Sequence, residues 1–220
     1  MTKFLTNDKT RPMKRSLLLL FFIVPFFLTA QSYTFDVLTK YKRVYKGKER
    51  ESIVYSDSEN QTYFLFLYKD HGKTTAKLYD TKNKSIYNFD VLETLSNKEV
   101  FFDFKYVNAT KLQLNESRFK NYRYEFKTVK TDSLKSQIEF RAYDSNKKGA
   151  ERTIHFVALK IPKNLFHIFQ FSCLHPHEFE NLIPNGNYLV EYAKETTRDN
   201  ENVEYKLMEL KEVNFKLDVK

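Results

Sequence analysis

The sequence predicts a mainly β protein built as a single antiparallel sheet domain of about ten strands with a short helical insert. Apolar and polar residues alternate with a period of two in segments from residue 33 to residue 219. The chain also contains 15 Tyr and 21 Phe, residue types that favour strands. Polar segments rich in Asn, Asp and Gly separate the alternating stretches at hairpin spacing. A half-barrel, a closed barrel and a sandwich all fit this pattern.

The first 30 residues are typical of an export signal preceded by a short extension. In residues 13–30, two basic residues precede an apolar run, and Thr29-Ala30 supplies a cleavage site. The apolar run at 17–28 is shorter than the about 20 residues that span a membrane. We interpret residues 1–12 as an upstream extension of the reading frame. No lipid-accepting cysteine follows the cleavage site, because Gln31 stands there.

These features predict an exported protein of the periplasm or the extracellular space that is not an integral membrane protein after cleavage. The chain has 37 Lys and Arg against 28 Asp and Glu, and its first 30 residues hold five of the former and one of the latter. Residues 31–220 therefore carry a net charge of +5. Such a modest charge does not predict nucleic acid binding. Residues 31–220 are long enough for one β-rich domain.

The alternating segments give the expected strands in chain order. They lie at 33–41, 62–68, 99–107, 122–128, 138–142, 188–192, 203–207 and 213–219. The segment "TYFLFLY" is apolar on both faces, which predicts a central strand covered on both sides, and "EVFFDFKYV" is nearly so. Polar turns are expected at 80–85, 143–149 and 196–202.

Residues 161–187 interrupt the strand pattern and predict a helical crossover. The spacing of Leu165, Ile168 and Phe169 predicts one short helix. Pro176 is well placed as the first residue of a second helix, which Pro184 would end. We expect this segment to lie over one face or one end of the sheet.

The segment "CLHPHE" is the sharpest candidate for chemistry. In an extended segment alternate side chains point the same way, so a thiolate and two imidazoles could meet one metal ion such as zinc, with a carboxylate beside them. The alternative is a loop ahead of a helix, in which the cysteine packs as a small apolar residue. Known zinc sites mostly use longer spacings, so we rank this site third among the functions and expect no cofactor. The candidate ligands are Cys173, His175, His177 and Glu178.

A basic and aromatic segment, "YKRVYKGKER", is a candidate patch for a polyanion or for anionic lipid headgroups. Charge and stacking would provide the binding. The alternative is a strand end and its turn, where Lys and Arg residues keep an edge solvated. The residues of this patch are Tyr41, Lys42, Arg43, Tyr45, Lys46, Lys48 and Arg50.

Enzyme motifs are incomplete in this chain. "HEFEN" begins like the zinc-protease helix signature, but Asn181 stands where the second histidine must coordinate. "HGKTT" lacks the earlier glycine of a phosphate-binding loop. These departures favour a non-enzymatic protein over an enzyme.

In size, leader, strand count and single helical insert, the chain resembles uncharacterised exported β-sheet proteins of Gram-negative bacteria. Some of these are similar to the periplasmic lipoprotein carriers, whose fold is an open half-barrel with helices over its concave face. The resemblance implies binding of acyl chains or another apolar ligand and carries over no functional residue.

Two functions are therefore expected. The first is a binding protein that holds an apolar or lipid ligand in a curved sheet, with residues 161–187 as a lid. The second is a periplasmic or extracellular module that contacts a protein or glycan through exposed Tyr and Lys.

Overall fold

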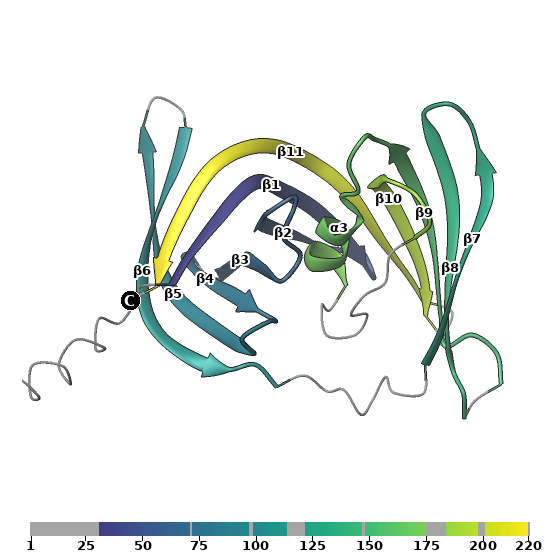
Figure 1. Ribbon diagram of the computed structural model, residues 1–220, viewed down its shortest axis with the longest axis horizontal. Coiled ribbons are helices and arrows are strands. Elements are labelled where there is room, and N and C mark those ends of the chain that lie inside the picture. The colour runs from purple at the N-terminus through teal and green to yellow at the C-terminus, as the bar shows by residue number, and fades with distance from the viewer. Residues whose placement is uncertain are drawn as a thin grey trace, which may run out of the picture.

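The computed structural model describes residues 31–70, 72–96, 99–113, 122–146, 148–174, 184–197 and 201–219, which form one antiparallel sheet and one short helix (Figure 1). The fold class expected from the sequence is thus confirmed. The strands are β1 (Gln31–Tyr45), β2 (Lys48–Ser56), β3 (Tyr63–Asp70), β4 (Lys73–Asp80), β5 (Ser85–Ser96), β6 (Glu99–Lys111), β7 (Tyr122–Thr131), β8 (Lys135–Asp144), β9 (Arg152–Lys160), β10 (Tyr188–Thr197) and β11 (Asn202–Val219).

The first and last strands meet at the centre of the sheet. The strand order is β6-β5-β4-β3-β2-β1-β11-β10-β9-β8-β7. β1 pairs with β11 along its whole length, from Gln31 opposite Val219 to Tyr45 opposite Val203. The chain therefore makes one meander from β1 to β6 and a second from β7 to β10, and β11 joins the two. Because the order runs in one sheet from β6 to β7, the described residues form neither two stacked sheets nor a closed ring of strands.

The edge position of β6 differs from the sequence expectation. The segment at 99–107 reads as nearly apolar on both faces, yet β6 ends the sheet, and its Phe101 and Val107 are exposed. Its Phe102 and Phe104 pack on a buried cluster, whereas the opposite face stays uncovered. By contrast, β3 lies between β2 and β4, as the doubly apolar segment at 62–68 predicts.

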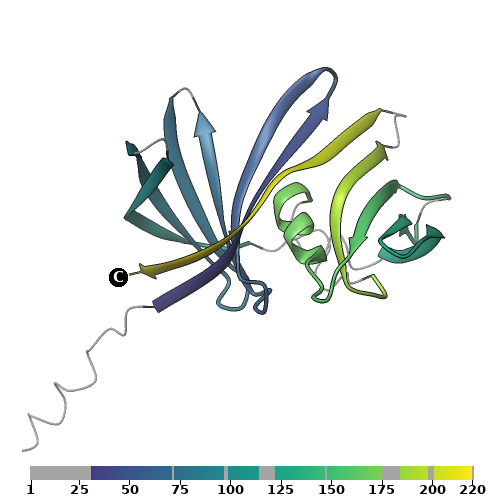
Figure 2. The ribbon, with the colours of Figure 1, turned by 90° about the horizontal axis from the view of Figure 1, so that it is seen from above.

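The described residues form three hydrophobic clusters, and β1 and β11 contribute to the two larger ones. Figure 2 shows β3–β6 on one side, β7–β10 on the other, and the long strands β1 and β11 crossing between them. On β11, Tyr205 belongs to the cluster around the helix and Leu217 to the second cluster. Pairing between β1 and β11 shifts register twice, between Phe35 and Val37 and between Lys40 and Tyr41. Such irregularities bend a strand, and here they accompany its passage from one cluster to the other.

The helix α3 (Phe166–Cys173) lies under the arch of β1 and β11 (Figure 1). Residues 166–172 are all buried. Phe169 is fully buried, and the rings of Tyr41, Phe156 and Tyr205 surround it at centroid distances of 5.6, 5.5 and 5.7 Å. An isolated helix of this length is unstable in water, so these contacts hold it in place.

The first short helix expected from the sequence is thereby confirmed, and its buried face makes the helix part of the core. The second expected helix, beginning at Pro176, lies outside the described residues. Among the described residues, no helix has the length and apolar character needed to cross a membrane.

We predict that Phe169→Ala lowers the free energy of unfolding by about 3–5 kcal/mol, because the large ring is fully enclosed and its removal leaves a cavity. Chemical denaturation followed by circular dichroism would measure this loss. Leu134→Ala is the control, since Leu134 is 70% exposed and its truncation should change stability by less than about 0.5 kcal/mol. Equal effects of the two substitutions would contradict a core role for α3.

Candidate functional site

A groove lies where β2 and β3 separate. Pairing between the two strands runs only from Ile53 opposite Leu67 to Ser56 opposite Phe64. Residues 48–52 of β2 continue beside β1, and residues 68–70 of β3 continue beside β4. Figure 2 shows the β1–β2 hairpin leaning away from the strands that follow it. The gap between the strands is a groove of about 1000 Å³, and Ser172 and Cys173 at the end of α3 also line it.

Aromatic side chains form much of the groove. Phe66 and Tyr68 line it and stack on each other with centroids 4.5 Å apart. A smaller hollow of about 210 Å³ shares these two residues, Ser172 and Cys173 with the groove. That hollow continues along Phe64, whose ring stacks on Phe171 of α3 at 4.4 Å. The groove and the hollow together give an aromatic surface beside the C-terminal end of α3.

Tyr68 keeps a neutral ring in this surface. Its hydroxyl lies 2.8 Å from that of Tyr79. Burial, followed by the bond to Tyr79, raises the pKa of Tyr68 well above its usual value. The phenol is therefore uncharged at any physiological pH, and its ring offers a largely apolar contact with one hydroxyl group.

The structure divides the basic and aromatic patch of the β1–β2 hairpin between interior and surface. Tyr41 is buried, and its hydroxyl donates a hydrogen bond of 2.6 Å to the carbonyl of Val190. Tyr45 is half-buried, packs against the helix cluster and donates a hydrogen bond to Glu201. Tyr41 therefore belongs to the interior, whereas the Tyr45 ring contacts Arg43 and Lys46, whose charged groups lie 5.2 and 5.3 Å from its centroid.

The basic residues of the same patch have different surroundings. Arg43 and Arg50 both line the groove. Lys42 forms an ion pair of 3.0 Å with Glu49, and Lys46 forms one of 2.5 Å with Glu201. Lys48 is exposed at the start of β2. The patch thus contributes two arginines to the groove.

Cys173 is the only one of the four candidate metal ligands among the described residues; His175, His177 and Glu178 lie outside them. The cysteine is half-buried and lines the groove. Burial raises the pKa of its thiol well above the usual value, against a smaller opposing effect of Arg43. A neutral thiol is a poor nucleophile and a poor metal ligand. Within the described part of the chain, no three His, Cys, Asp or Glu side chains gather into a possible metal site.

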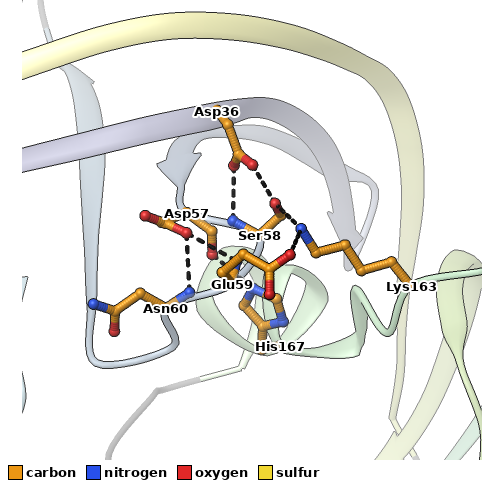
Figure 3. Close-up of polar contacts among 7 residues, drawn as sticks. All are labelled: Asp36, Asp57, Ser58, Glu59, Asn60, Lys163 and His167. Atoms are coloured by element: carbon orange, nitrogen blue, oxygen red, sulfur yellow. Dashed lines mark hydrogen bonds and ion pairs between the residues drawn. The ribbon is translucent and has the colours of Figure 1, made fainter.

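A polar cluster fixes the N-terminal end of α3 to the loop between β2 and β3 (Figure 3). Asp36 accepts hydrogen bonds from the backbone N–H of Ser58, at 2.7 Å, and from its hydroxyl. Lys163 donates a hydrogen bond of 2.5 Å to the same hydroxyl and forms an ion pair of 2.5 Å with Glu59. The contacts join β1, the loop and the segment that enters α3, so they position one wall of the site.

His167 adds a buried contact to this cluster. Its Nε2 atom lies 3.2 Å from the carbonyl oxygen of Asp57, and the residue is 4% exposed. Its Nδ1 atom has no hydrogen-bond partner among the described residues. Burial lowers the pKa of His167, although the contact with the Asp57 carbonyl and the charges of Asp57 and Asp36 oppose the decrease.

Sequence reasoning did not find the polar cluster. A local pattern indicates one part of it. Asp57 accepts hydrogen bonds from the backbone N–H groups of Glu59 and Asn60, as aspartates in turns commonly do. The contacts of Asp36 and Lys163 join residues far apart in the chain, and no local pattern indicates them.

We predict that acid weakens the folded state through His167. In the unfolded chain the imidazole has its ordinary pKa of 6.5, whereas in the folded protein the pKa is lower. The free energy of unfolding should therefore decrease as the pH falls from 6.5 towards the folded pKa. Urea denaturation at several pH values between 5 and 8 would measure this decrease in the free energy of unfolding. His167→Gln should flatten this dependence, whereas His155→Gln, a control at an exposed position of β9, should keep it. An unchanged slope in His167→Gln would contradict the assignment.

Comparisons with known proteins show no family for this chain. No protein-family model matches the chain, and no curated protein matches it. The crystal structure of a DUF1329 family protein from Desulfovibrio piger covers 84% of this chain and 86% of that chain, with 9% sequence identity and a TM-score of 0.23.

Proposed function

We propose that the protein is an exported, non-enzymatic binding protein that holds the apolar part of a ligand, such as a lipid acyl chain, in the groove between β2 and β3. The observation that carries the proposal is the groove of about 1000 Å³ with Phe66 and Tyr68 on its lining. Pockets for small ligands commonly measure roughly 300–1,000 Å³ and are lined by aromatic and apolar side chains.

The distribution of packing supports a ligand in this groove rather than elsewhere. The space under the arch is filled by α3, whose Phe166 and Phe169 are buried among aromatic rings. Along the groove, in contrast, Phe66 is half-buried and Tyr68 is 36% exposed. Concave aromatic surface that stays open to solvent is typical of a binding site.

The groups beside the groove favour binding over catalysis. The Ser172 hydroxyl lies 3.2 Å from the hydroxyl of Thr39, and both residues are buried. Burial raises the pKa of the neighbouring Cys173 thiol and so keeps it protonated. Neither side chain has the adjacent general base that activates a nucleophile among the described lining residues.

We predict that the protein binds cis-parinaryl alcohol, a fluorescent eighteen-carbon chain with a neutral head, and that Phe66→Asp weakens this binding at least about tenfold. A carboxylate on the lining loses water when an apolar chain covers it, which costs well over 1.4 kcal/mol. Fluorescence titration would give both dissociation constants.

The matched control is Phe101→Asp, the same exchange at an exposed phenylalanine of β6 that does not line the groove. It should bind the alcohol like the wild type, and thermal unfolding would verify that both variants fold. Failure of the wild type to bind, or equal binding by all three proteins, would contradict the proposal.

The natural occupant can be sought independently. Full-length chain would be expressed with its leader, recovered from the exported fraction and weighed by native mass spectrometry before and after organic extraction. Extra mass that disappears on extraction and releases a fatty fragment would support the proposal. Recovery of the uncleaved chain in the cytoplasm would contradict the expected export.

A further inference from the structure

Two arginines face each other across the β1–β2 hairpin. Arg43 of β1 pairs directly with Arg50 of β2, and both line the groove. The register follows from the tight turn at Lys46 and Gly47, whose φ angles are 50° and 71°. Side chains directly opposite on antiparallel strands lie on the same face, with Cβ atoms about 4.5–5.5 Å apart. Like charges at such positions destabilise a hairpin, so the Arg43–Arg50 pair lowers the stability of this one.

The surrounding charges do not neutralise the two arginines. The neighbouring acids are engaged by lysines: Glu49 pairs with Lys42 at 3.0 Å and Glu51 with Lys40 at 2.8 Å. Alternation directs these four side chains to the strand face opposite to the arginines, although Glu49 and Glu51 also line the groove, where their charges are balanced by the two lysines. Neither Arg43 nor Arg50 forms an ion pair with another described residue.

Arg43 is held in place by contacts that leave donors unused. Its guanidinium lies over the ring of Tyr45, 5.2 Å from the centroid, and against the hydroxyl of Tyr205. That hydroxyl donates a hydrogen bond of 3.0 Å to the buried Glu195, which fixes its position. A guanidinium has five N–H donors in a planar fork that matches carboxylate and phosphate oxygens. Because the side chain is already ordered, binding an anion costs little further conformational entropy.

A third cation faces the aromatic part of the same groove. Lys77 of β4 lines the groove, and its Nζ atom lies 5.5 Å from the centroid of the Tyr68 ring. Lys69, which also lines the groove, is paired with Glu93 at 2.9 Å. Asp70, a further acid on the lining, has an interaction partner of its own. The groove therefore combines unpaired positive charge with an aromatic surface.

We infer that the ligand is an amphiphile with an anionic head, a carboxylate or a phosphate, whose oxygens bind between Arg43 and Arg50 while its apolar chain lies along Phe66 and Tyr68. This inference rests on the proposed function, which supplies the site for the chain. It adds the chemical class of the ligand and assigns a role to the opposed arginines.

The test compares two probes with the same chain and different heads, cis-parinaric acid and cis-parinaryl alcohol. Wild type should bind the acid at least about tenfold more tightly than the alcohol, and added salt should reduce this difference. Arg43→Gln and Arg50→Gln should each weaken acid binding about tenfold and leave alcohol binding unchanged. Lys130→Gln, at an exposed position of β7 that does not line the groove, should behave like the wild type.

Competition distinguishes a lipid head from a free anion. Inorganic phosphate or acetate at millimolar concentration should displace the acid only weakly, because neither has a chain. Displacement by either anion at concentrations similar to those of the acid would assign the arginines to a free anion and overturn the inference. Equal binding of acid and alcohol by the wild type and both arginine variants would also overturn it, with the proposed function intact. If neither probe binds, both fail.

Discussion

The pairing of β1 with β11 is the constraint on which the rest of the structure depends. It joins the first and last strands of the fold over the span from Gln31 to Tyr45, so neither meander completes the sheet without it. Both strands pass from one hydrophobic cluster to the other, and the two register shifts accompany this passage. The curvature that results makes room under the arch for α3. Because this pairing joins segments at opposite ends of the described residues, closing it costs conformational entropy and is expected to slow folding.

The helix then determines where open space remains. Its aromatic residues fill the concave side next to β8–β10, and the hydroxyl of Tyr41 adds a tie from β1 to the carbonyl of Val190 on β10. The polar cluster around Ser58 and His167 holds the other end of the helix against the loop after β2. Fixed at both places, α3 ends with Cys173 at the point where β2 and β3 part, and so it closes one side of the groove.

Local patterns in the sequence contained the elements of the fold but not their distant contacts. Alternation located β1, β3, β6, β7, β8, β10 and β11 but not β2, β4, β5 or β9. The spacing of Leu165, Ile168 and Phe169 located the helix, because both patterns depend on neighbours a few residues apart. The turn at Gly47 even implies the opposition of Arg43 and Arg50. Burial of Tyr41 depends on a helix more than 100 residues away, and the edge position of β6 depends on the strand order. Neither leaves a local signal, and the groove likewise depends on distant segments, because residues of the β1–β2 hairpin and of α3 both line it.

The separation of β2 from β3 explains why the groove has a polar, charged rim beside an aromatic surface. Had the pairing continued past Ile53 and Leu67, the backbone groups of the two strands would bond to each other and the gap would close. Where the described strands separate, these edges need water or a ligand as partner, so the rim stays polar. The face of β3 turned towards α3 keeps its aromatic residues, since Phe64 must still pack on Phe171. The separation of the two strands thus places charged, solvated strand ends beside an apolar surface. This arrangement is complementary to a molecule with an anionic head and an apolar chain.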